Sequence, residues 1–168
     1  MKILQLVQKP QRRGAEIFAY QLSQPLRQQG HQVKTIYIYP FAGNKPLDLK
    51  PHDIVLNGDE THFFEKFPGV HPVILLRLIR QIKRFQPDVI QVNGARTIKY
   101  GAFAKLIIRP KQWVIVYRNI DNPSYWVTDP YRKFFYKEIV ILKNVEIINK
   151  ILIEEVNSIS DIPVSLCQ

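Results

Sequence analysis

The residues best suited to binding an anion lie close to the N-terminus, in the segment Arg12-Arg13-Gly14-Ala15-Glu16. Backbone N–H groups at the start of a helix attract phosphate-like groups, and a glycine there lets a ligand approach the backbone closely. Arg13 adds positive charge, and Glu16 is placed to complement the helix dipole or to bind a sugar hydroxyl. A second interpretation stays open, in which Gly14 only permits close packing and Glu16 only stabilises the helix start.

A second group of polar residues follows two predicted strands in the middle of the chain. Its members are Asn93, Gly94, Arg96, Asn119 and Asp121. The strands 88–92 and 112–117 precede them, and ligands bind where the carboxyl ends of parallel strands meet at one edge of a sheet. We therefore expect these residues to line one cleft. For Asn93 an alternative stays open, because asparagine is also a good N-cap for the helix that follows.

The predicted alternation of strands and helices places both groups of candidate residues at the same edge of the sheet. The apolar run 3–7 indicates a buried parallel strand, and Gly30 ends the helix that follows it. The buried face of that helix is predicted from three- and four-residue spacing to carry Ala15, Phe18, Leu22 and Leu26. Further strands are expected at 33–39, 53–57, 88–92, 112–117 and 145–148, and further helices at 72–85, 100–107 and 131–142.

This order predicts an α/β fold, namely a Rossmann-like, doubly wound, mostly parallel sheet with helices on both faces. The 168 residues suffice for one domain with a hydrophobic core. We expect a single domain over residues 1–168, with a poorly patterned C-terminal tail at 150–168.

The helix 72–85 carries opposed apolar and basic faces. Its apolar face holds Leu75, Leu78, Ile79, Ile82 and Phe85. The opposite face holds Arg77, Arg80 and Arg84, flanked by Val73 and Leu76. A surface that mixes cations with apolar residues is able to rest on an anionic membrane. The alternative is a solvated face of a surface helix.

The chain is strongly basic, with 24 Lys and Arg against 14 Asp and Glu and a net charge of +10. This balance favours phosphate-bearing ligands or an anionic membrane surface as partners. Nucleic acid is not expected, because no recognised motif and no stacking platform accompany the charge. The single cysteine, Cys167, excludes an internal disulfide and fits a reducing compartment. We expect a cytoplasmic protein that can lie peripherally on the inner face of the membrane.

Other chemistry finds little support in the sequence. The four histidines show no metal-ligand spacing and one cysteine cannot build a zinc site, so we expect no metal and no bound cofactor. The P-loop, the dinucleotide fingerprint and the nucleophile elbow are all absent. A signal peptide and a stretch of about 20 apolar residues are also missing.

Two segments resemble the family 4 glycosyltransferases, which have the two-domain GT-B fold. That family opens with a strand, a loop ending in Gly-Gly-Ala/Met-Glu, a helix, and then Gly-His-x-Val. The matching positions are Gly14, Ala15, Glu16, Gly30, His31 and Val33. Arg13 replaces the first glycine of the usual pair. The segment 86–94 resembles the family's Pro-Asp-(apolar)-(apolar)-x-x-His-Gly, with Asn93 in place of histidine.

The resemblance covers roughly residues 1 to 150 and implies the N-terminal, acceptor-side half of such an enzyme. It implies transfer of a sugar, with retention, from a nucleotide-sugar donor to a glycan or lipid-linked acceptor, as in cell-wall or polysaccharide biosynthesis. The loop 13–16 would hold the donor diphosphate, and the five polar residues of the second group would line the acceptor cleft. No catalytic residue is identified.

The family's donor-binding domain carries two glutamates at seven-residue spacing, and Glu154 with Glu155 does not match this motif. We therefore expect the chain to lack the donor domain, to be inactive alone, and to need a C-terminal domain or a separate subunit. A homodimer through the face left for that domain is a further expectation. The alternative function is a non-catalytic basic module that binds anionic membrane or polysaccharide through Arg77, Arg80 and Arg84.

Overall fold

The computed structural model describes residues 1–41, 43, 46–56, 69–108 and 113–118. Its elements are β1 (Lys2–Val7), α1 (Gly14–Gln28), β2 (Gln32–Tyr37), β3 (Ile54–Val55), α3 (Pro72–Phe85), β4 (Val89–Asn93), α4 (Ala95–Ile107) and β5 (Val114–Arg118). The strand expected at 145–148, the helix at 131–142, the tail at 150–168 and the single-domain assignment involve residues outside this part, so they stay predictions.

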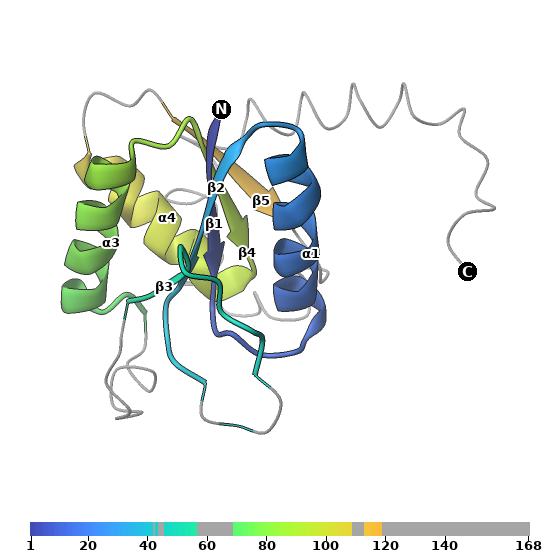
Figure 1. The fold of residues 1–168 in the computed structure, drawn as a ribbon. Coiled ribbons are helices and arrows are strands. Elements are labelled where there is room, and N and C mark those ends of the chain that lie inside the picture. Colours follow the sequence, from blue (N-terminus) through green and yellow to red (C-terminus); the bar gives the residue numbers. More distant parts are fainter. Residues whose placement is uncertain (42, 44–45, 57–68, 109–112, 119–168) are drawn as a thin grey trace, which may run out of the picture.

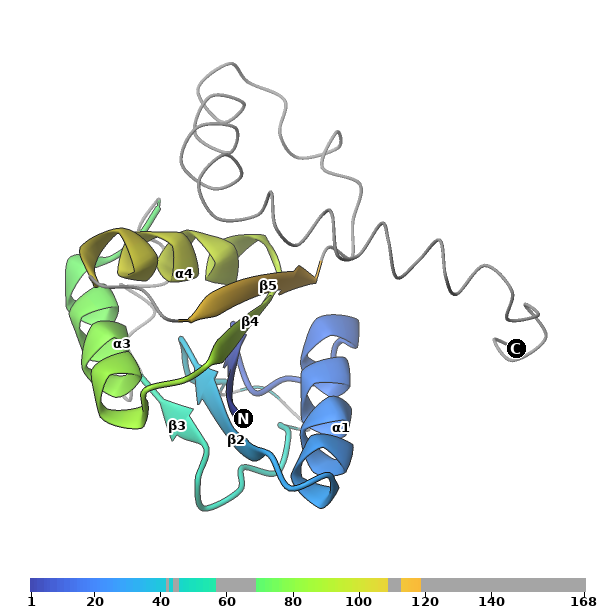
Figure 2. The ribbon, with the colours of Figure 1, turned by 90° about the horizontal axis from the view of Figure 1, so that it is seen from above.

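The five strands form one sheet in the order β3-β2-β1-β4-β5, and every neighbouring pair is parallel. The register places Leu4 of β1 opposite Lys34 on one side and Ile90 on the other. Helix α1 lies on one face of the sheet, whereas α3 and α4 lie on the other (Figures 1 and 2). This arrangement confirms the predicted Rossmann-like, doubly wound sheet with helices on both faces.

The main hydrophobic core lies between the sheet and the helices α3 and α4. Alternate residues of β1 and β4 supply it from the sheet, and Ile74, Leu78, Ile79 and Ile82 supply it from α3. The predicted bounds of α3 and its central apolar residues are confirmed, while Leu75 and Phe85 are only half-buried. Residues of a parallel sheet are covered on both faces, which explains the nearly continuous apolar run of β1.

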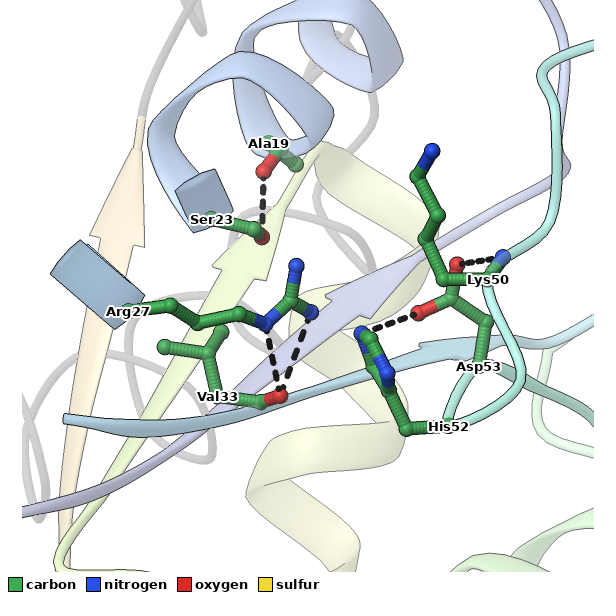
Figure 3. Close-up of polar contacts among 7 residues, drawn as sticks. All are labelled: Ala19, Ser23, Arg27, Val33, Lys50, His52 and Asp53. Atoms are coloured by element: carbon green, nitrogen blue, oxygen red, sulfur yellow. Dashed lines mark hydrogen bonds and ion pairs between the residues drawn. The ribbon is translucent and has the colours of Figure 1, made fainter. Parts of the chain in front are cut away.

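The buried face of α1 differs from the prediction. Glu16, Ala19 and Ser23 are its buried residues, whereas the four predicted apolar residues are half-buried. The buried face of α1 therefore consists of small and polar side chains, and Glu16 and Ser23 each have a hydrogen-bond partner. The Ser23 hydroxyl donates to the carbonyl oxygen of Ala19 at 2.7 Å, one turn earlier (Figure 3).

The end of α1 is joined to the start of β2. Gly30 has a φ of +84°, as expected of the glycine that follows a helix, and its N–H donates to the Arg27 carbonyl at 2.9 Å. The guanidinium of Arg27 donates from Nη2 to the Val33 carbonyl at 3.2 Å (Figure 3). These bonds set the distance between the helix and the strand.

Gly101 on α4 marks the closest approach of that helix to the sheet. A Cβ added there would lie 2.9 Å from Cγ1 of Val92 and 3.7 Å from Cδ1 of Ile115. The residue is therefore required by packing, because a side chain would push α4 away from β4.

We expect Gly101→Ala to lower the free energy of unfolding, because overpacking costs about 1–3 kcal/mol while the better helix propensity of alanine returns about 1 kcal/mol. Val92→Ala in the same chain should recover part of the loss. Urea unfolding measures both effects. The control is Gly14→Ala, where an added Cβ meets no atom within 4 Å. Equal stability of the two alanine variants would contradict the prediction.

Candidate functional site

The candidate site is the position in the sheet, between β1 and β4, at which the strand order reverses. β1 and β4 are neighbours, α1 begins after the carboxyl end of β1, and α4 begins after that of β4. The two helices lie on opposite faces of the sheet (Figure 2). Open α/β sheets bind ligands at such a topological switch point. We call the carboxyl ends of β1 and β4, with the first turns of α1 and α4, the switch-point edge.

The start of α1 is open at this edge. Arg12, Arg13 and Gly14 are all exposed, and no side chain caps the helix at its N-cap residue, Arg13. An uncapped first turn leaves backbone N–H groups available to an anion. Residues 12–14 therefore form an exposed, basic, glycine-bearing turn, and the role of residues 13–16 as a phosphate loop stays a prediction.

Glu16 is buried and takes part in holding the loop. It is 6% exposed, and its Oε1 accepts a hydrogen bond of 2.9 Å from Nε2 of Gln11, which is itself buried. The Gln11 backbone N–H also donates to Lys9, and its carbonyl accepts from Arg13. These bonds fix the path of the loop, so Glu16 acts on its shape rather than facing solvent. Sequence inspection missed Gln11, because a lone polar loop residue carries no periodic signal.

The loop is also supported from the segment after β2. Pro46 forms an isolated bridge with Gln11, and the Leu47 N–H donates to the Pro10 carbonyl at 2.9 Å. Leu47 is buried, at 5% exposure. The loop that carries Arg13 is therefore held from two sides before any ligand binds.

Asn93 does not cap α4. The N-cap residue is Gly94, whose φ is +109°, and Asn93 is the last residue of β4 and 2% exposed. Its Nδ2 donates to Oε1 of Gln5 at 3.0 Å. Gln5 Nε2 donates to Oε1 of Gln91 at 3.2 Å, and Gln91 Nε2 donates to Oδ1 of Asn93 at 3.1 Å. Three amides thus form a closed ring, which we call the amide ring.

The amide ring joins β1 to β4 just before the switch-point edge. Gln5 and Gln91 are directly opposite each other in the sheet register, and Asn93 lies two residues further on the same side of its strand. Asn93 therefore ends β4 with its side chain in the amide ring, and its place in the acceptor cleft stays a prediction. The sequence held one signal for this contact, because each of the two apolar strands contains a glutamine. Polar side chains that are buried in neighbouring strands must pair with each other.

Arg96 lies in the first turn of α4 and is half-buried. Its guanidinium carbon is 5.7 Å from the centroid of the Tyr39 ring. Tyr39 was not predicted as a site residue. Asn119 and Asp121, the remaining cleft candidates, lie outside the described residues, so their place in the cleft stays a prediction.

A separate polar cluster lies where the segment before β3 meets α1 and β2 (Figure 3). Asp53 accepts a hydrogen bond from the Lys50 N–H at 2.9 Å, and its second oxygen is 3.8 Å from Nε2 of His52. Burial, and next the Asp53 carboxylate, raise the pKa of Tyr37 well above its ordinary value.

A cavity of about 840 Å³ lies at the opposite edge of the sheet, away from the switch-point edge, and is lined in part by Lys2, Lys83 and Trp113. In the part of the chain that the structure describes, no three His, Cys, Asp or Glu residues are grouped to hold a metal ion. The same part contains no helix with the length and apolar character needed to cross a membrane.

The fold defines the class: a Rossmann-like α/β domain with two helix starts at its switch-point edge that no side chain caps. A family model for Glycosyltransferase Family 4 matches residues 12–146, and the chain belongs to that family. This confirms the resemblance found in the two sequence segments. No curated protein matches the sequence significantly.

One solved structure supports the fold. The chain is similar to sucrose-phosphate synthase from Thermosynechococcus elongatus, with 17% identity, a TM-score of 0.54, and coverage of 83% of this chain and 40% of that one. It is also similar to HepE from Anabaena, crystallised with UDP and glucose, with 20% identity, a TM-score of 0.49, and coverage of 75% and 32%. The chain thus spans well under half the length of either structure.

We expect Asn93→Asp to destabilise the fold by about 1–3 kcal/mol at neutral pH, because a carboxylate would replace the donor that faces the Gln5 carbonyl oxygen. Burial raises the pKa of the new carboxyl in the folded state, so the loss should shrink as pH falls and the proton restores a donor. Urea unfolding across pH measures this. Gln32→Glu, at an exposed position, is the matched control, and an equal effect in both variants would contradict the amide ring.

Proposed function

We propose that this domain is the acceptor-binding half of a glycosyltransferase that moves a sugar from a nucleotide-sugar to a glycan or lipid-linked acceptor. The observation that carries the proposal is the meeting of two helix N-termini at the switch-point edge, neither capped by a side chain. Arg12, Arg13 and Arg96 stand in or beside these turns, and neither turn presents an exposed acid. Two helix dipoles and three cations favour a doubly charged group such as a diphosphate.

The chemistry of sugar transfer explains why such an edge is useful. Negative charge grows on the diphosphate as its bond to the sugar breaks, and N–H groups already held in place stabilise that charge. The start of α1, with Arg13 and Gly14, would serve this purpose. Gly94 and Arg96 at the start of α4 would lie beside the diphosphate on the side of the acceptor, with the buried Asn93 at the end of β4 supporting them.

Activity would require a second, donor-binding domain. The similar solved structures are much longer than this chain, which spans 32% and 40% of their lengths. We propose that a partner domain, in the same protein or in another subunit, supplies the rest of the nucleotide-sugar site. The domain described here would bind the acceptor side and contribute the glycine loop, without transferring sugar by itself.

Binding of inorganic pyrophosphate to the full chain tests the proposed loop. We expect NMR shifts of the Gly14 and Ala15 amides on titration. Arg13→Ala should weaken binding about tenfold, because a hydrogen bond to a charged group contributes about 1.5–3 kcal/mol. Gly14→Ala should weaken it without unfolding the chain, since no atom lies within 4 Å of the added Cβ. Arg80→Ala removes the same charge far from the edge and should leave binding unchanged.

If Arg80→Ala and Arg13→Ala weakened pyrophosphate binding equally, the effect would come from net charge alone. That result would contradict a binding site in the loop. A second experiment measures sugar transfer by the protein joined to a donor domain. There, unchanged sugar transfer after combined Arg13→Ala and Gly14→Ala substitution would refute the role in the donor diphosphate site.

A second candidate function is contact with an anionic membrane, and it has a specific observation in its favour. The outer face of α3 carries six exposed residues, which we call the α3 stripe. They are Val73, Leu76, Arg77, Arg80, Lys83 and Arg84. Val73 and Leu76 are 42% and 64% exposed, and α3 contains no acidic residue. Apolar and basic side chains on one helix face suit the surface of an anionic bilayer, such as the inner face of a cytoplasmic membrane.

Co-sedimentation with vesicles tests the α3 stripe. Each cation near an anionic surface contributes about 1 kcal/mol, so combined Arg80→Ala and Arg84→Ala substitution should weaken binding roughly thirtyfold. The control removes the same charge at the switch-point edge through Arg12→Ala and Arg13→Ala and should have a much smaller effect. Binding that ignores both anionic lipid content and salt would refute this function.

A further inference from the structure

Tyr39 connects three element ends at the carboxyl edge of the sheet. It follows β2, and its backbone N–H donates to the Gln8 carbonyl at 3.0 Å, continuing the pairing in which Ile38 donates to Val7 at 2.9 Å. Gln8 is the first residue of the loop that leads to Arg13 and Gly14. The backbone of Tyr39 is therefore held against the start of the β1–α1 loop.

The hydroxyl of Tyr39 is tied to both helices of the opposite face. It lies 3.2 Å from the hydroxyl of Tyr100 on α4, and the Tyr100 oxygen accepts a hydrogen bond of 3.0 Å from the backbone N–H of His71. His71 is the N-cap residue of α3. Tyr39 and Tyr100 are 1% and 0% exposed. Buried hydroxyls need partners, so this chain of bonds fixes the orientation of the Tyr39 ring.

The ring of Tyr39 in turn meets Arg96. The guanidinium carbon lies 5.7 Å from the ring centroid, within the range of a cation–π contact. An arginine side chain otherwise samples many rotamers. A fixed aromatic ring beside it restricts that freedom, and a guanidinium carries five N–H donors around its rim, more than one ring contact occupies.

We propose that Tyr39 is a positioning residue, which holds the Arg96 guanidinium at the switch-point edge for an anionic group of the ligand. This inference rests on the proposed function, because it takes Arg96 as a ligand-binding group. Tyr39 contacts the β1–α1 loop through its backbone and Arg96 through its ring. One residue therefore fixes the position of Arg96 relative to that loop.

The contact itself is tested by NMR without any ligand. The ring should shift the Arg96 δ protons upfield in the full chain. Tyr39→Phe keeps the ring but loses its bond to Tyr100 and should reduce the shift, whereas Tyr39→Leu should abolish it. Tyr100→Phe breaks the hydroxyl chain without altering the Tyr39 ring and should reduce the shift, so it replaces Tyr39→Leu if that variant does not fold. Unshifted Arg96 protons in the unmodified protein would overturn the inference.

A double-mutant cycle with inorganic pyrophosphate tests positioning. We expect Arg96→Ala to weaken binding about tenfold and Tyr39→Leu several-fold, with Tyr39→Phe between Tyr39→Leu and the unmodified protein. In the Arg96→Ala background, Tyr39→Leu should have no further effect, because its role passes through Arg96. A purely structural role would instead multiply the two losses.

The outcomes separate this inference from the proposed function. If Arg13→Ala weakens pyrophosphate binding but the Tyr39 and Arg96 effects multiply, the loop keeps its function and the positioning role is overturned. If pyrophosphate does not bind, the proposed anion site fails and the inference fails with it, whether or not the Arg96 ring shift is present. If the shift is present and the cycle is non-additive, both stand.

Discussion

The pairing of β1 with β4 is the constraint on which the rest of the structure depends. β1 also pairs with β2, so it is held on both sides at the middle of the sheet. Helices leave the two strands on opposite faces, which brings the starts of α1 and α4 to one edge. The amide ring fastens this pair, because a slip in register would break the bonds of Gln5, Gln91 and Asn93 together.

The two faces of the sheet make different contributions. The face beneath α3 and α4 buries the larger apolar cluster and supplies most of the hydrophobic driving force. The face beneath α1 has a small apolar cluster and several buried polar groups, including Gln5, Glu16 and Ser23. Polar groups whose bonds are satisfied restrict a core to one arrangement. That restriction holds the loop before α1 in one shape, and a preformed loop binds an anion without first being ordered.

Residues with a local signal were predicted well. The apolar spacing of 72–85 predicted the bounds of α3, and the segment from Ile3 to Val33 predicted strand, turn, helix and strand in order. The alternative in which Asn93 caps α4 is wrong, because Gly94 is the N-cap residue. The burial of Glu16 and Asn93 was not predicted, because charged and amide residues are mostly exposed. The buried face of α1 was also misplaced, since close packing against the sheet used Ala19 and Ser23 rather than the larger apolar residues beside them.

The sequence by itself determined the class of fold, the position of the basic glycine turn and the family. Those features depend on short-range periodicity and on short motifs in a set order. Only the tertiary structure decided which polar side chains remain available at the switch-point edge. The partners that bury Asn93 and orient Tyr39 lie 88 and 61 positions away along the chain, at Gln5 and Tyr100. No local pattern encodes such contacts, because they form only when the sheet brings distant strands together.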